Sequence, residues 1–158
     1  MAGIAFAIIG VLYAILMTFV IVSVWEAGDG AQDSSRAEAR AVVDLNHYAD
    51  TLPAAEGAAM RELTGEYIHI VEQQEWPAMA GGQPVGRAGS AVISKLWKCV
   101  DAPLPDGADA AANRQSEARA DLRALTLNRD ARLAAADAGL PSVTVDVFTD
   151  VVDDGTAR

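Results

Sequence analysis

The sequence predicts an all-α protein with one N-terminal transmembrane helix, a small bundle of about four helices and a disordered acidic tail. Three observations support this prediction. Residues 4–24 are apolar and uncharged, apolar residues recur at helical spacing through the middle of the chain, and the last stretch is rich in Asp. We therefore divide the chain into a membrane helix (1–25), a linker (26–33), a helical soluble module (34–140) and a tail (141–158).

Composition excludes several classes of protein. The chain has 158 residues, 12 of them basic and 22 acidic, and its net charge is −10. No charged side chain precedes Glu26, so this negative charge belongs to the later part of the chain. An acidic surface repels phosphate backbones, which argues against nucleic acid as a partner. Cys99 is the only cysteine, so an internal disulfide is excluded.

The N-terminal segment has the length of a membrane span. Residues 4–24 would form a helix of roughly 31 Å, close to the thickness of the hydrocarbon core. A cleaved signal peptide is the alternative, but the basic N-terminal region and the short apolar core of such peptides are missing. We therefore predict an uncleaved anchor in the lipid bilayer, with Trp25 as its membrane-interface residue.

Small residues follow one side of this predicted helix. Gly3, Ala7, Gly10 and Ala14 recur at spacings of four, three and four residues, which lets membrane helices approach one another closely. The stripe predicts a helix-packing interface with other membrane helices, such as those of a homo-oligomer. The alternative is that Gly and Ala are simply common in this segment.

Basic residues suggest the orientation of the chain. Arg36 and Arg40 are the only ones near either end of the apolar segment, and short basic flanks stay on the cytoplasmic side. This predicts a bacterial inner-membrane protein with its C-terminal module in the cytoplasm.

The soluble module begins with two predicted helices. Ser35 and Glu38 form a possible capping box, which would start a helix at that point. Pro53 ends this helix or starts the next, whose closing signal is Trp76-Pro77. The apolar faces are Val42, Leu45, Ala49 and Leu52 on the first helix, and Met60, Leu63, Tyr67, Ile70 or Val71 and Gln74 on the second.

Two further helices follow a glycine-rich connector at residues 81–89. Ser90 is expected to cap the first of them, which carries Ile93, Leu96, Trp97 and Val100. The second is a long Ala-rich helix over 109–138, followed by Gly139 at the usual position after a helix. Its thin stripe consists of Leu122, Leu125, Arg129, Leu133 and Ala136.

Candidate chemistry is sparse. The pairs Asp44 with His47 and Glu66 with His69 have the spacing found in diiron bundles. However, each histidine is expected to face away from the apolar seam, which argues against a buried metal site. Four further residues have a functional and a structural interpretation. Glu72, Glu75 and Trp76 form either an acidic cluster beside a binding aromatic or a packed helix end, and Cys99 is either an activated thiol or a buried filler.

The structural interpretation is favoured for all of these residues. We therefore predict that the protein is not an enzyme, and that it has no catalytic residue, no cofactor and no metal site.

The chain resembles the bacterial bestrophin-like membrane domain, a family of unknown function. The similarity covers about residues 3–142, and it rests on landmarks that occur in the family's order. They are Gly10-Val11-Leu12-Tyr13-Ala14, Val24-Trp25-Glu26, Glu38-Ala39, Leu52-Pro53, Arg61, Leu63, Tyr67, Glu75-Trp76-Pro77, Arg129, Arg132-Leu133 and Gly139-Leu140-Pro141. The resemblance implies a polytopic membrane protein with a cytoplasmic helical module and a distant likeness to bestrophin anion channels.

The sequence departs from that plan at both ends. It begins without a preceding membrane helix, and an acidic tail follows Val143 where the resemblance implies another hydrophobic hairpin. We interpret the chain as a truncated or frame-shifted relative. Two functions stay open: a subunit or fragment of an ion-channel-like assembly, and a membrane-tethered interaction module without transport activity.

Overall fold

The computed structural model describes residues 2–103 and 109–137, and the side chains of residues 10–22, 30–103 and 109–137. All regular secondary structure in this part of the chain is helical, as the sequence predicted. The helices are α1 (Ala2–Asp50), α2 (Ala54–Ile70), the π-helical turn η1 (Val71–Glu75), α3 (Trp76–Ala80), α4 (Ala88–Val100) and α5 (Asp109–Asp137). The predicted disordered tail, Gly139 and the end of the last predicted helix at residue 138 lie outside the described residues.

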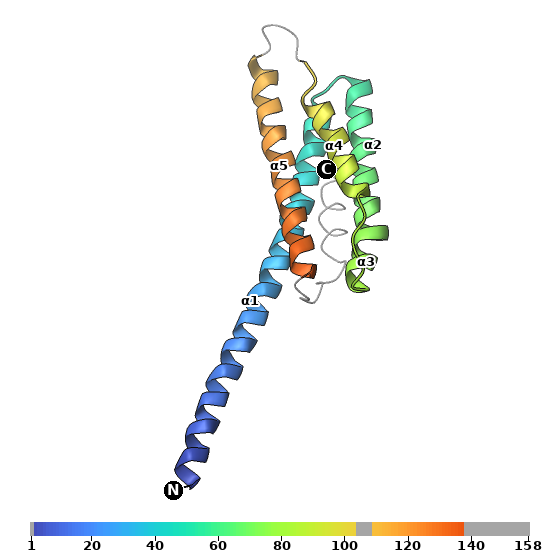
Figure 1. Ribbon diagram of the computed structural model, residues 1–158. Helices are drawn as coiled ribbons and strands as arrows, with labels where there is room; N and C mark the ends of the chain where they lie inside the picture. Colours follow the sequence, from blue (N-terminus) through green and yellow to red (C-terminus); the bar gives the residue numbers. More distant parts are fainter. Residues whose placement is uncertain (1, 104–108, 138–158) are drawn as a thin grey trace.

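The bundle packs on only one half of α1 (Figure 1). α5 runs antiparallel to the C-terminal half of α1, and these two helices form the most extensive pair in the described chain. The core is apolar, with Leu45, Met60, Leu96, Leu122 and Leu125 fully buried. The N-terminal half of α1 projects away from the bundle.

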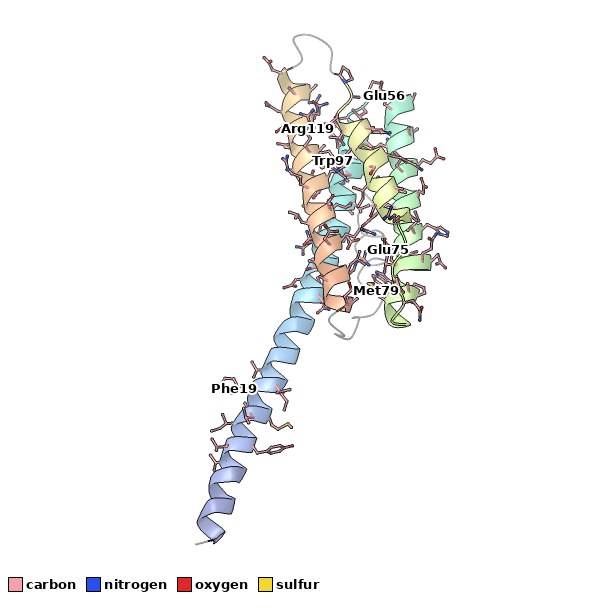
Figure 2. All side chains as sticks on the ribbon, viewed as in Figure 1. Phe19, Glu56, Glu75, Met79, Trp97 and Arg119 are labelled. Carbon is pink, nitrogen blue, oxygen red and sulfur yellow. The ribbon has the colours of Figure 1, made fainter. Side chains whose placement is uncertain are left out.

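The projecting half of α1 exposes large apolar side chains (Figure 2). Phe19 is 67% exposed, Leu16 is 64% exposed, and the other large apolar residues between Val11 and Val22 are also exposed. Among the residues that the structure describes, no helix combines the length and the apolar character needed to cross a membrane.

The predicted linker at 26–33 was wrong, because α1 runs through it without a break. The linker was predicted from Gly28 and Gly30. A glycine costs only about 1 kcal/mol inside a helix, so these two do not end a helix that is favourable on both sides. The predicted capping box was also wrong. Ser34 and Ser35 instead donate hydrogen bonds to the carbonyl oxygens of Gly30 and Ala31 within the same helix, at 2.9 and 3.0 Å.

The first helical connection agrees with the role expected of Pro53. α1 ends at Asp50, and Pro53 immediately precedes α2. Gly57 then brings α2 against α1, because a Cβ atom at this position would collide with the carbonyl oxygen of Ala49. The close approach of α2 to α1 thus depends on a glycine near the start of α2.

The second predicted helix continues past its expected end. Trp76-Pro77 does not close it, since the helical path runs through η1 and α3 to Ala80. The connector that follows is shorter than predicted, because α4 begins at Ala88. Ile93, Leu96 and Val100 are buried as predicted, whereas Trp97 is half-buried.

The long Ala-rich helix is confirmed as α5. Leu122, Leu125 and Arg129 of its predicted stripe are buried. Gln115 near its start donates to the carbonyl oxygens of Val100 and Ala102 at 2.7 and 2.8 Å. These two bonds satisfy carbonyl groups at the end of α4 and fix it to α5.

Candidate functional site

Five polar residues from four helical elements meet inside the bundle. We call them the buried charge cluster: Glu38 of α1, Tyr67 of α2, Glu75 of η1, and Arg129 and Arg132 of α5. Glu38 and Tyr67 are fully buried, and the other three are no more than 5% exposed. Buried charges need partners of opposite sign, and the two carboxylates and two guanidinium groups balance one another.

Arg132 lies at the centre of this cluster. Its Nε and Nη2 atoms donate to the two carboxylate oxygens of Glu38 at 2.7 and 2.9 Å. The same Nη2 atom donates to Oε2 of Glu75 at 2.7 Å. This bidentate pairing with Glu38 fixes the direction of the guanidinium group as well as its charge.

Arg129 holds the other oxygen of Glu75. Its Nη2 and Nε atoms lie 2.7 and 3.0 Å from Oε1 of that carboxylate. Its Nη1 atom donates to the hydroxyl oxygen of Ser90 at 3.1 Å. Ser90 was predicted to cap α4, but it lies inside that helix, and its side chain links α4 to the buried charge cluster.

Gly89 makes room for this arrangement. A Cβ atom at Gly89 would collide with Oε1 of Glu75 and would lie 3.1 Å from Nε of Arg129. The backbone of α4 therefore packs directly against the ion pair, and no larger residue fits without moving it.

The π turn explains how Glu75 reaches the interior. The buried residues of α2 and η1 include Thr64, Tyr67 and Val71, and an unbroken α-helix would bring Gln74 inward next, as the sequence analysis predicted. Instead the Trp76 amide donates to the Val71 carbonyl five residues earlier, which adds one residue to the turn. Gln74 is consequently exposed and Glu75 is buried.

Pro77 gives a physical reason for the π turn. It has no backbone N–H, and in a regular α-helix its ring would collide with the carbonyl four residues earlier. The wider turn just before Pro77 relieves that collision. The proline thereby helps to set the rotation that carries Glu75 toward α5.

Protonation in the cluster is fixed by its surroundings. Burial, and then the charge and hydrogen bond of Glu38, raise the pKa of Tyr67 far above its usual range. Tyr67 therefore keeps its proton and donates it to Oε1 of Glu38 at 2.6 Å. Burial lowers the pKa of Arg132, but hydrogen bonds and charge attraction from Glu38 and Glu75 outweigh burial and raise it overall.

The cluster is therefore built to hold helices together. All four charged groups are paired and almost closed to solvent, so none has the access to substrate that general acid–base chemistry requires. Arg132 connects α1 to η1, and its Nη1 atom also lies 3.6 Å from the sulfur of Met79 in α3. Together with Arg129, which reaches Ser90 of α4, it fastens α1, η1, α3 and α4 to α5.

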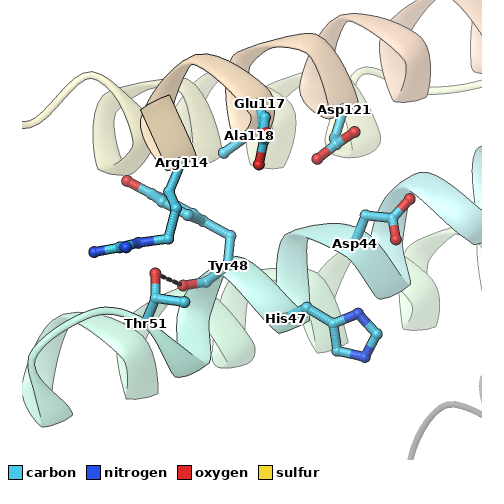
Figure 3. A pocket seen from close by; sticks show the side chains of 8 residues that line it. All are labelled: Asp44, His47, Tyr48, Thr51, Arg114, Glu117, Ala118 and Asp121. Atoms are coloured by element: carbon cyan, nitrogen blue, oxygen red, sulfur yellow. Dashed lines mark hydrogen bonds between the residues drawn. The ribbon is translucent and has the colours of Figure 1, made fainter. Parts of the chain in front are cut away.

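A second polar feature lies farther along the same pair of helices (Figure 3). A groove of about 400 Å³ is bordered by side chains of α1 and α5. We call it the acidic groove, after Asp44, Glu117 and Asp121. None of these three carboxylates has an ion-pair partner among the described residues.

Asp121 shows the effect of the neighbouring negative charges, although Arg114 also borders the groove. Partial burial, followed by the negative charges of Asp44 and Glu117, raises the pKa of the Asp121 carboxyl. At the rim of the groove, burial likewise raises the pKa of Tyr48, although Arg119 and Arg114 oppose that effect.

The histidines face outward, as their spacing predicted. His47 and His69 are both exposed, and Glu66 beside His69 pairs with Lys95 at 3.1 Å. Within the described residues, no group of three or more His, Cys, Asp or Glu side chains is arranged to hold a metal ion. The two acid-x-x-His pairs are thus not brought together in a common buried site.

The predicted helix-packing residues lie on the projecting half of α1. Gly10 and Ala14 are exposed there. The helix also contains Gly3, Ala7 and Trp25, but their side chains lie outside the described ones.

Two other candidates have structural surroundings. Cys99 is partly buried and packs against the core, in line with its interpretation as a filler. Of the candidate acidic cluster, Glu75 belongs to the buried charge cluster, whereas Glu72 is only partly buried. For Glu75, the structure therefore agrees with the prediction of a packed helix end and not with that of an acidic binding cluster.

The buried charge cluster was not predicted from the sequence. Glu38 was assigned to a local cap because its true partner, Arg132, is 94 residues away in the sequence. Arg129 was placed on the core-facing stripe without a partner. The available signals were an Arg on an otherwise apolar stripe and a proline two residues after Glu75.

The fold and the site define an all-helical bundle mounted on a long helix with an exposed apolar half. The model of the bestrophin-like domain family matches residues 1–145 of the chain. This protein therefore belongs to the bestrophin-like domain family, which confirms the resemblance found in the sequence. Comparisons with curated proteins and with solved structures give no match.

Proposed function

We propose that this protein is a non-enzymatic subunit of a bestrophin-like, channel-like assembly in the bacterial inner membrane. The apolar half of α1 lies in the bilayer, and the bundle forms a cytoplasmic collar beside it. Three observations support the proposal: membership of the bestrophin-like family, the exposed apolar side chains of α1, and the absence of charge before Glu26. The described side chains of the apolar half cover residues 10–22, and the sequence on both sides of that range is also uncharged up to Glu26.

The continuity of α1 is the observation that carries this proposal. A single helix runs from the apolar half into the bundle, where Glu38 is held by Arg132 through two short hydrogen bonds. A rotation or tilt of the apolar half is therefore transmitted to the collar, because no flexible linker separates the two. This is the mechanical coupling that a regulatory collar needs.

A pore lined by the apolar half of α1 requires several copies of this helix to assemble. We propose that Gly3, Ala7, Gly10 and Ala14 form the face on which helices of neighbouring copies pack, with Trp25 at the membrane interface. The small side chains would allow close backbone contact, and the larger residues would face lipid.

Membrane extraction and cross-linking test this proposal. The full-length chain should stay in the membrane after an alkaline carbonate wash. In a Cys99→Ala background, Gly10→Cys and Ala14→Cys should form disulfide-linked dimers, whereas the control variants Leu12→Cys and Leu16→Cys should form fewer. Release by carbonate, or monomers at all four positions, would rule out the proposed assembly.

Recording in planar bilayers separates the two functions that the sequence left open. Reproducible ion-selective current steps from the reconstituted oligomer are expected. A stable, membrane-retained protein that gives no current would instead support a tethered interaction module without transport.

A further inference from the structure

The segments that connect the helices at the two ends of the bundle differ in charge. At one end, the helix connections are flanked by charged side chains, including Asp50, Glu56, Asp101 and Asp109. At the other end, residues 76–86 contain no Asp, Glu, Lys or Arg, and we call this segment the uncharged tip. It comprises α3 and most of the loop that leads to α4.

The uncharged tip lies at the end of the bundle from which the apolar half of α1 emerges (Figure 1). The C-terminal end of α5 lies at the same end. A groove of about 600 Å³ opens there, bordered by Met79 and Val85 of the tip and by Leu133 and Asp137 of α5, of which Asp137 carries the only charge among the described residues that line the groove. Met79 and Val85 are half-buried, and Pro84 between them is exposed.

We infer that the uncharged tip contacts the headgroup layer of the same bilayer that holds α1. This inference rests on the proposed function, because it requires the apolar half of α1 to be inserted. The partner is a phospholipid surface, to which Met79, Pro84 and Val85 present apolar groups that carry no charge to desolvate.

The geometry of α1 sets the height of the tip above the membrane. Arg132 pairs with Glu38, and α5 continues for five residues beyond it, so its end is level with about residue 33 of α1. From there to Glu26, the first charged residue, α1 has seven residues, which corresponds to about 10 Å. The headgroup layer fills roughly 5–8 Å of this distance. The remaining gap is about the length of one side chain.

Charge supports lipid as the occupant of this surface. An acidic segment would be repelled by anionic lipids, and the charged opposite end of the bundle points away from the apolar half of α1. The charged residues resume at Arg87, directly after the tip, and a cation there suits lipid phosphate groups. The buried charge cluster anchors α5 to α1 and so keeps this end of the bundle at a fixed distance from the membrane.

Site-specific fluorescence quenching tests the inference. In a Cys99→Ala background, one fluorophore is attached at a time to Val85→Cys in the tip, to Glu56→Cys at the opposite end, or to Leu16→Cys in the apolar half. Gln83→Cys is a second tip position in case Val85→Cys does not fold, which far-UV circular dichroism would reveal. Each full-length chain is reconstituted into phosphatidylcholine vesicles that contain lipids with a nitroxide on either the headgroup or the acyl chain.

The expected result is strong quenching of the Leu16 label by the acyl-chain nitroxide and several-fold stronger headgroup quenching at Val85 than at Glu56. If the Leu16 label is quenched while the tip label behaves like the Glu56 label, the tip inference is overturned and membrane insertion stands. If the Leu16 label escapes quenching, the proposed function fails together with the inference. A tip label shielded from both the headgroup nitroxide and aqueous iodide would overturn the inference in favour of a contact with a second copy.

Discussion

The α1–α5 interface carries charge at two places, and these differ in balance and in hydration. In the buried charge cluster, carboxylates and guanidinium groups are equal in number and almost fully closed to solvent. In the acidic groove, Asp44, Glu117 and Asp121 line an open surface without an ion-pair partner among the described residues. The difference shows that burial demands opposite charges, whereas hydration lets one pair of helices tolerate like charges a few turns away.

Removing the central cation should break the buried charge cluster. Among the described residues, Arg132→Met leaves Glu38, which is 0% exposed, without a cation, and Glu75 with one cation instead of two. Breaking a buried pair in this way costs about 3–5 kcal/mol of unfolding free energy. Urea unfolding followed by circular dichroism in one fixed detergent would measure this loss.

Arg119→Met is the matched control for this substitution. Arg119 lies on the surface of α5, the helix that also contains Arg132, and pairs with Asp101 at the end of α4 at 2.7 Å. An exposed pair of this kind contributes about 0–1 kcal/mol. The double variant Glu38→Leu with Arg132→Met leaves the neutral pair of Glu75 and Arg129, so it should lose less than the two single losses together. Equal losses for Arg132→Met and Arg119→Met would contradict the distinction between buried and hydrated charge.

Gly89→Ala should disturb the same cluster through the backbone. The added methyl group would collide with the Glu75 carboxylate and crowd Nε of Arg129, so the ion pair or α4 must move. Crowding of this kind costs about 1–3 kcal/mol. The measurement is again urea unfolding in detergent.

Gly65→Ala provides a control for which the expected change in stability has the opposite sign. Gly65 lies inside α2, and a Cβ atom there would meet nothing within 4 Å. Alanine should therefore stabilise the helix by about 0.5–1 kcal/mol. If Gly89→Ala stabilises the protein as Gly65→Ala is expected to, the close packing assigned to Gly89 is wrong.

Local sequence patterns predicted the helices but not the cluster that joins them. The burial of Leu122 and Leu125 and the exposure of His47 followed from helical spacing alone, and the structure confirms each of these expectations. Spacing fails at Glu75 because the π turn inserts one residue, so the same rule points to Gln74. A single added residue is enough to exchange a neutral side chain for a charged one in the interior.

Glu38 was missed for a different reason. Its spacing from Ser35 fits a capping box, but α1 is already helical at that point and needs no cap. Glu38 instead forms an ion pair with Arg132, which is far away in the sequence. A local pattern contains no information on such a pair. Gly28 and Gly30 led to the wrong prediction of a linker for a similar reason. The helix is stable on both sides of them and therefore continues through both glycines.

The smallest expected effect lies in the acidic groove and should change with pH. Asp121→Asn removes a like-charge pair with Glu117 one helical turn earlier and eases the repulsion from Asp44. At neutral pH the variant should be more stable by about 0.2–0.5 kcal/mol for the pair with Glu117, and salt should reduce this gain. Asp130→Asn on the same helix should give no gain, because Asp130 has Arg129 at 3.9 Å.

The sign of the pH dependence follows from the raised pKa of Asp121. The folded state holds the proton of this carboxyl more tightly than the unfolded state, whose pKa stays near 3.8. The native protein therefore gains stability from Asp121 as the pH falls through the raised pKa toward 3.8, and the advantage of Asp121→Asn should fade in that window. Unfolding of both proteins at a series of pH values would measure this change. An advantage that stays constant down to pH 3.8 would show that the effect of the Asp121→Asn substitution comes from packing and not from charge.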